Sequence, residues 1–364
     1  MTSDAMTSTE WPEQVPGSPG GGSSGSRWPT ALRIGILLLI LIALGWVVLI
    51  TAQYCSTGKP ISELPGVPGP VDDLFDSSSF RYVSSIEGLQ NPMGVAVGLD
   101  GRVYVTETGG ARKIHVYDSL GKQELGSFSS PGSDTADRVP IYVAVNPKGD
   151  VYVSDRGASK IFIFSPDGTP QGEVAPPEGA ENWHPLGLTF DEAGNLYVAD
   201  VTPDKHRVLV MDPTGKLKLS FGTQGEKKGQ FLYPNGIVVD DRGRIFVADS
   251  NNGRMQAFDK DGKFLFLISR GMSKGDLAMP RGIAIDTHGR LLIVDTTRGS
   301  IQAYKVSDLG EADGAGAPVE FKGVFYGDSG RRISFQFPNG MALDGRNKVY
   351  IADRGNNRVS IWEY

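Results

Sequence analysis

One unit recurs six times from residue 92 onward, and this repetition constrains the fold more than any other feature of the chain. The copies are PMGVAVGLDGRVYVTE at 92, PIYVAVNPKGDVYVSD at 140, PLGLTFDEAGNLYVAD at 185, PNGIVVDDRGRIFVAD at 234, PRGIAIDTHGRLLIVD at 280 and PNGMALDGRNKVYIAD at 338. Successive copies start 48, 45, 49, 46 and 58 residues apart. Periods of this length that each contain several strands are typical of β-propeller blades.

Each repeat divides into four predicted strands. A Pro-x-Gly turn precedes a first apolar strand such as 283–285, and an Asp-x-x-Gly hairpin leads to a second such as 245–248, which ends in an acid. The hairpin glycine can take the positive φ that other residues resist. Segments such as 254–258 and 263–268 supply the third and fourth strands. We therefore predict an all-β fold, a six-bladed β-propeller of four-stranded antiparallel blades over residues 80–364.

The last repeat supplies only three strands before the sequence reaches Tyr364. Residues 80–88 (FRYVSSIEG) resemble the rim strand at 264–271 in pattern. We expect this N-terminal strand to pair beside the last blade and close the ring, because closure removes exposed sheet edges.

The unit PNGIVVDDRGRIFVADSNNGRMQAFDKDG from residue 234, preceded by FGTQGEKKGQFLY, resembles an NHL repeat almost position for position. The resemblance extends over residues 80–364 and is closest in the fourth and sixth repeats, which carry Asp-x-x-Asn-x-Arg at 249–254 and 353–358. It implies a six-bladed NHL-type propeller. Glu107, Lys160 and Ser300 depart from the pattern, so the polar pairing of their blades is expected to differ.

Residues 34–52 (IGILLLILIALGWVVLITA) contain no charged side chain, and 19 helical residues span about 28 Å, close to the hydrocarbon thickness of a bilayer. We predict a transmembrane helix over residues 32–53, with a cleaved signal peptide as the alternative. Arg27 and Arg33 precede this segment and only Lys59 follows it closely, which favours a cytoplasmic N-terminus. The expected location is the cell membrane, with a single span and an extracytoplasmic propeller.

The segments flanking this predicted span have the composition of unstructured chain. Residues 1–31 are rich in Ser, Thr, Gly and Pro and are expected to form a disordered cytoplasmic tail. Residues 54–79 are rich in Pro, Gly and Ser, which predicts an extended linker. The single cysteine, Cys55, excludes an internal disulfide and is either an intermolecular partner or an inert residue at the membrane boundary.

The charge of the repeat region bears on its partners. Positions 1–79 hold 3 basic and 7 acidic residues, which leaves 33 basic against 35 acidic residues in the rest. Nucleic-acid binders concentrate Lys and Arg to displace counterions. We therefore expect no nucleic-acid partner.

The Pro-x-Gly turns and the loops after the second strand should open onto one face of the propeller, which we call the loop face, and the Asp-x-x-Gly hairpins onto the other. We expect the variable residue of each Pro-x-Gly to line the central rim of the loop face and to bind a protein or a small polar or anionic ligand. These residues are Met93, Tyr142, Leu186, Asn235, Arg281 and Asn339. The alternative for the two asparagines is that they only satisfy turn backbone.

An acid ends the second strand of every repeat: Glu107, Asp155, Asp200, Asp249, Asp295 and Asp353. A ring of carboxylates could bind calcium. A residue present in every blade is more simply explained as structural, accepting loop amide hydrogens and pairing with the basic residue about five positions later. We expect these six acids to be structural and not to hold a metal.

The four histidines bear on catalysis, since catalytic zinc typically needs three converging ligands. His115 falls mid-strand, His288 in an opposite-face hairpin, and only His184 and His206 on the loop face. We therefore expect no catalytic residue, metal or cofactor, and a binding, sensing or scaffold module. The alternative is a metal-dependent hydrolase or lyase acting in the central channel, because lactonases and peptidyl-α-hydroxyglycine lyases have similar propellers.

Overall fold

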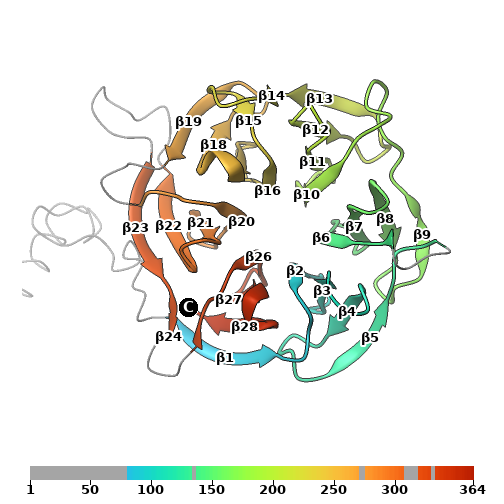
Figure 1. Cartoon of the computed structure of the whole chain (residues 1–364), viewed down its shortest axis with the longest axis vertical. Coiled ribbons are helices and arrows are strands. Elements are labelled where there is room, and N and C mark those ends of the chain that lie inside the picture. Colours follow the sequence, from blue (N-terminus) through green and yellow to red (C-terminus); the bar gives the residue numbers. More distant parts are fainter. Residues whose placement is uncertain (1–79, 133–136, 270–274, 307–318, 329–332) are drawn as a thin grey trace, which may run out of the picture. The chain divides into compact units, whose positions relative to one another are not determined.

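The computed structural model describes residues 80–132, 137–269, 275–306, 319–328 and 333–364. Six four-stranded antiparallel sheets surround a common axis, with the first strand of each repeat innermost (Figure 1). All described strands belong to the unit of residues 71–364. The predicted six-bladed β-propeller is therefore confirmed.

Blades 1 to 3 each use four consecutive strands, which run in order from the centre outward. Blade 1 contains β2 (Pro92–Val97), β3 (Val103–Glu107), β4 (Ile114–Tyr117) and β5 (Glu124–Phe128). Blade 2 contains β6 (Pro140–Val145), β7 (Val151–Asp155), β8 (Lys160–Phe164) and β9 (Pro170–Glu173). Blade 3 contains β10 (Pro185–Phe190), β11 (Leu196–Asp200), β12 (Arg207–Met211) and β13 (Leu217–Phe221).

Blades 4 and 5 follow the same order. Blade 4 contains β16 (Pro234–Val239), β17 (Ile245–Asp249), β18 (Arg254–Phe258) and β19 (Phe264–Ser269). Blade 5 contains β20 (Pro280–Ile285), β21 (Arg290–Asp295), β22 (Ser300–Val306) and β23 (Val319–Phe325). Two short pairs lie outside the blades: β14 (Thr223–Gln224) with β15 (Gln230–Phe231), and β24 (Gly327–Asp328) with β25 (Ile333–Ser334).

The sixth blade combines both ends of the repeat region. It contains β26 (Pro338–Leu343), β27 (Lys348–Asp353) and β28 (Arg358–Glu363), and β1 (Arg81–Ile86) pairs antiparallel with β28 as its outermost strand. The ring of Tyr82 meets Trp362 edge-on at 5.3 Å, and Phe80 stacks on Phe325 of blade 5 at 4.3 Å. The N-terminal strand thus closes the ring (Figure 1).

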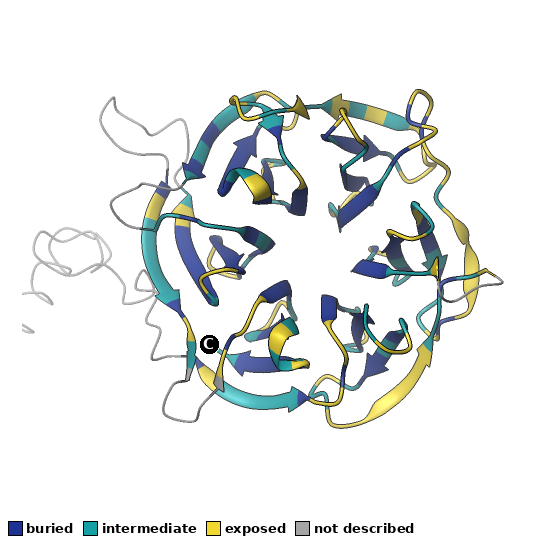
Figure 2. Cartoon of the chain, viewed as in Figure 1, coloured by how far each residue is buried: buried dark blue, intermediate teal, exposed yellow. Residues whose placement is uncertain are grey.

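The hydrophobic core lies between neighbouring blades. Tyr104 of blade 1 and Phe162 of blade 2 belong to one buried cluster, and Phe246 of blade 4 and Leu291 of blade 5 belong to another. Burying each such side chain stabilises the fold by about 1.5–3 kcal/mol. The outermost strands β5 and β9 are mostly exposed, whereas the inner strands are buried (Figure 2).

The glycine of the Pro-x-Gly turn allows the innermost strands to approach one another. A Cβ atom on Gly187 would collide with the carbonyl oxygen of Asn235 in the next blade, and one on Gly236 would collide with that of Arg281. Only glycine avoids this clash without moving backbone. The glycine of the turn is therefore required for the close approach of the strands at these two positions.

The predicted tail at 1–31, membrane span at 32–53 and linker at 54–79 lie outside the described residues. Within the ranges that the structure describes, we find no helix of the length and hydropathy that a membrane crossing requires. The anchor remains a prediction from the sequence.

Candidate ligand-binding site on the loop face

Tyr142 fills the centre of the ring. Aligning the repeats placed it between the proline and the glycine of its unit, but it occupies the glycine position itself, after Pro140 and Ile141. Its register also differs, since the irregularity after Pro140 ends at Tyr142, which pairs with Ser154, whereas in the other blades it extends one residue further. Its side chain is 8% exposed, so blade 2 supplies a large ring to the channel where the other five blades have glycine.

The hydroxyl of Tyr142 connects three blades. It donates toward Oδ1 of Asn339 in blade 6 at 3.0 Å, and it lies 3.3 Å from Oδ1 of Asn235 in blade 4. Asn339 in turn directs Nδ2 toward the sulfur of Met93 at 3.5 Å. Burial raises the pKa of Tyr142 to about 12, while the nearby charge of Arg281 acts in the opposite direction.

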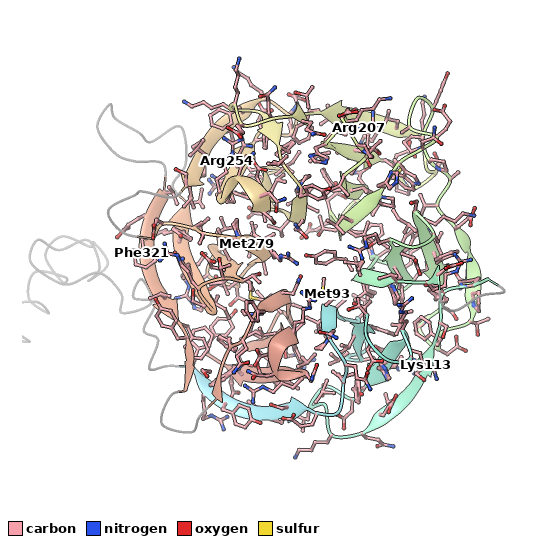
Figure 3. All side chains as sticks on the ribbon, in the orientation of Figure 1. Met93, Lys113, Arg207, Arg254, Met279 and Phe321 are labelled. Carbon is pink, nitrogen blue, oxygen red and sulfur yellow. The ribbon has the colours of Figure 1, made fainter. Side chains whose placement is uncertain are left out.

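The structure brings all six predicted rim residues together at the centre. Met93, Tyr142 and Leu186 share a buried apolar cluster, and Figure 3 shows Met93 at the inner end of its blade. Asn235 directs Nδ2 to the carbonyl oxygen of Tyr233 and to the hydroxyl of Ser250, so its amide satisfies local turn groups. The two asparagines are buried and committed to these contacts.

A cavity of about 380 Å³ opens on the loop face beside this centre. Of the six predicted rim residues, Met93 and Arg281 line it. The other lining residues are Asn91, Thr108, Arg112, Val139, Ile141, Arg156 and Arg354. The lining contains four arginines and no carboxylate, which makes it an electropositive pocket of the size that small ligands use.

Three of these arginines were not singled out from the sequence. Arg156 and Arg354 directly follow the blade acids at the ends of β7 and β27, and Arg112 lies in the corresponding loop after β3. A signal was present, because blades 2 and 6 read Val-Ser-Asp-Arg and Ile-Ala-Asp-Arg whereas no other blade acid precedes a basic residue. These loops converge only because the ring places blades 1, 2 and 6 side by side.

The blade acids hold the loop that precedes the innermost strand. Oδ1 of Asp249 accepts the amide hydrogen of Leu232 at 2.7 Å, and Oδ1 of Asp353 accepts that of Gln336 at 2.7 Å. Each of these acids also receives an arginine Nε, from Arg254 at 2.7 Å and from the corresponding arginine of blade 6 at 2.9 Å. Burial raises the pKa of both carboxyl groups.

We call this pairing of a blade acid with an arginine the clasp. Blade 2 lacks the clasp, and in blade 5 an arginine at another position takes part in it. Lys160 directs Nζ to Glu173 on the rim strand at 2.7 Å, and Oδ2 of Asp155 is buried with no hydrogen-bond partner in the described residues. In blade 5, Arg298 lies 3.4 Å from Asp295 in place of a base at position 300. These are two of the repeats whose sequences depart from the pattern.

The histidines are dispersed, and no group of three or more His, Cys, Asp or Glu residues within the described ranges is arranged to hold a metal ion. His206 is 2% exposed beneath the ring of Tyr233, at 4.9 Å. Its Nδ1 lies 3.3 Å from the amide of Tyr233, and burial lowers its pKa. Trp183 is buried in the core between blades 2 and 3.

The family profile of the NHL repeat matches residues 231–258 and 335–362, in blades 4 and 6. The chain therefore contains NHL repeats within a six-bladed β-propeller. The two matched blades are the ones in which an aspartate, an asparagine and an arginine form the complete clasp, at Asp249–Arg254 and Asp353–Arg358.

Similar proteins differ widely in type. The B-box type zinc finger protein ncl-1 of Caenorhabditis elegans is 36% identical over 88 residues, 22% of this chain and 10% of that protein. The probable peptidyl-alpha-hydroxyglycine alpha-amidating lyase pgal-1 of the same organism is 37% identical over 90 residues, 23% of this chain and 25% of that protein. The chain thus matches a quarter or less of the length of each.

Solved structures agree in fold. A streptogramin B lyase superposes with a TM-score of 0.53 at 18% sequence identity, covering 78% of this chain and 97% of that one. At this identity the likeness shows the propeller architecture alone.

Proposed function

We propose that this propeller is a recognition module that binds a small polar ligand on its loop face and is held outside the cell membrane by an N-terminal helix. The observation that carries the binding part is the cavity of about 380 Å³ with its four arginines. A concave pocket of this size suits a small molecule better than the flat surface of a protein. The anchor rests on the uncharged run at residues 34–52.

Ligand binding is tested by screening the purified chain against neutral, cationic and anionic metabolites by thermal shift, followed by calorimetry of the hits. A ligand that binds the folded protein stabilises it by RT ln(1 + concentration/Kd), so its unfolding midpoint rises with ligand concentration. Val139→Phe places a larger side chain in the pocket and should abolish the shift, whereas Leu99→Phe, at a position 74% exposed in the hairpin between β2 and β3, should not. Hits that bind both variants equally would place recognition elsewhere.

Membrane attachment is tested by fractionation. The intact chain should remain in the membrane pellet after an alkaline carbonate wash, and a variant without residues 34–52 should not. Externally added protease should degrade the propeller in intact cells. Release by carbonate, or protection from external protease, would contradict the proposed anchor or its orientation.

The second candidate is a metal-dependent lyase, favoured by the 37% identity to pgal-1 over 90 residues. It requires that the purified chain bind a divalent ion and turn over a substrate. Elemental analysis after exhaustive dialysis, with turnover assays with and without added zinc, distinguishes it from recognition without turnover.

A further inference from the structure

We infer that the loop-face pocket takes an organic dianion, a small molecule with at least two carboxylate or phosphate groups beside an apolar part. This inference rests on the proposed function, because it names the ligand class of the same pocket. The pocket presents guanidinium groups together with an apolar wall of Met93, Val139 and Ile141.

The four arginines come from separate parts of the chain. Arg112 and Arg156 lie in the loops after β3 and β7, Arg281 lies in the innermost strand of blade 5, and Arg354 begins the 3₁₀ turn after β27. Like charges that share one pocket repel one another, which raises the free energy of the folded protein. Since no carboxylate lines the pocket, a bound anion is the group that would neutralise Arg156, Arg281 and Arg354.

Three of the four have no ion-pair partner among the residues that the structure describes: Arg156, Arg281 and Arg354. Arg207 and Arg254, by contrast, pair with their own blade acids at 2.9 and 2.7 Å. Nε of Arg281 is buried and, within the described chain, has no acceptor. A buried donor without a partner is costly, and an anionic oxygen would satisfy it.

Backbone strain points to the same pocket. The residue directly before the clasp arginine, or before the equivalent position of another blade, takes a left-handed conformation in several blades. This residue is Gly253 in blade 4, Gly299 in blade 5 and Asn357 in blade 6. Blade 1 has Arg112 there, at a φ of 51°. Such a conformation is unfavourable for a long side chain, and residues held in it cluster at functional sites. Arg112 is also the residue of this series that lines the arginine pocket.

The number of guanidinium groups and the apolar wall define the ligand class. One carboxylate is matched by one or two arginines in a bidentate arrangement, so the three arginines without an ion-pair partner suit at least two acidic groups. A bare inorganic ion would leave Met93, Val139 and Ile141 facing water. An organic dianion satisfies the two parts of the pocket together.

The test measures binding to the intact chain by calorimetry, at constant ionic strength. The probes are succinate, citrate, fructose 1,6-bisphosphate and inorganic phosphate, with glucose and spermidine as the neutral and cationic comparisons. We expect an organic anion to bind more tightly than inorganic phosphate. The bisphosphate and the carboxylates separate a phosphate ligand from a carboxylate ligand. Arg156→Gln and Arg354→Gln should each weaken binding about tenfold or more. Arg346→Gln, at an exposed arginine in the hairpin between β26 and β27, should leave it unchanged.

Arg112→Asn provides a check against misfolding, because asparagine tolerates the left-handed conformation. We expect weaker anion binding with an unfolding midpoint at or above that of the wild type. Binding of only a neutral or cationic compound in the pocket would overturn this inference and leave the proposed function standing. Equal anion affinity in Arg156→Gln and Arg346→Gln would also overturn it. The absence of any hit would overturn the two proposals together.

Discussion

The phenol oxygen of Tyr142 lies 3.0 Å from Oδ1 of Asn339, so a side chain of blade 2 bonds one of blade 6 across the axis of the ring. Tyr142 also lines a small cavity of about 50 Å³, together with apolar side chains of the inner strands and turn glycines. The centre of this propeller is therefore a packed and hydrogen-bonded core, and the space open to a ligand lies beside it, among the arginines.

Removing the hydroxyl of Tyr142 should loosen this centre. We expect Tyr142→Phe to lower the free energy of unfolding by about 1 kcal/mol, since the oxygen of the buried Asn339 loses its donor. Tyr142→Gly restores the glycine of the other repeats but leaves a cavity, and should cost about 3–5 kcal/mol. Urea unfolding measures each loss. Tyr326→Phe, at a position 53% exposed, serves as the control and should change little.

A clasp can be restored to blade 2. We expect Lys160→Arg to raise the free energy of unfolding by about 1–2 kcal/mol, because an arginine at this position reaches the blade acid in blades 4 and 6. The change gives a partner to the buried Oδ2 of Asp155 and loses only an exposed pair with Glu173. Lys148→Arg, in an exposed hairpin, should stay within about 0.5 kcal/mol of the wild type. Equal effects of the two changes would refute this account.

Phe337 combines exposure with an unfavourable backbone. It is 59% exposed and has a φ of 47°, in the left-handed region. We expect Phe337→Asn to stabilise the protein by about 1 kcal/mol, since asparagine adopts this conformation more readily and little apolar burial is lost. Tyr326→Asn matches it in exposure without the positive φ. Chemical denaturation should therefore show a gain for the first variant and none for the second.

Stability should fall in mildly acidic solution because of His206. Burial lowers the pKa of this imidazole in the folded state below its ordinary value of 6.5, so the unfolded chain binds a proton more readily. The free energy of unfolding therefore increases with pH in this range, and it decreases progressively as the pH falls below about 6.5. Protonation of Nδ1 would also remove the acceptor for the amide of Tyr233.

The measurement is the slope of the unfolding free energy against pH between about 5 and 7. His206→Gln should flatten this slope whatever it does to overall stability. His288→Gln, at an exposed hairpin position, should retain it. A slope unchanged in His206→Gln would assign the pH dependence to other groups.

The fold was predictable because its signals are local and repeated. The turn before each inner strand, the hairpin and the acid at the end of the second strand recur in register, and residues 80–88 have the pattern of a rim strand. The strand at Arg254–Phe258 was predicted with the bounds observed. Each of these features depends on neighbours in sequence or on a simple ring.

The site was harder to predict because it depends on distances between blades. Aligning the repeats brought Met93 and Arg281 to the centre correctly, but it misplaced Tyr142. The contacts that Tyr142 makes from the glycine position can be recognised only when the positions of blades 4 and 6 are known. The pocket arginines Arg156 and Arg354 lie in loops 198 positions apart, and nothing in the sequence states that these loops meet.

The pairing of Arg81 with Glu363 has a consequence for how the protein is made. Of the propeller strands, a ribosome releases β1 first and its partner β28 last, so β1 must wait unpaired while the strands between them are made. Contacts between residues so distant in sequence form slowly, and unpaired strands are prone to aggregate meanwhile. Synthesis of this propeller should therefore depend on factors that shield nascent strands until β28 emerges.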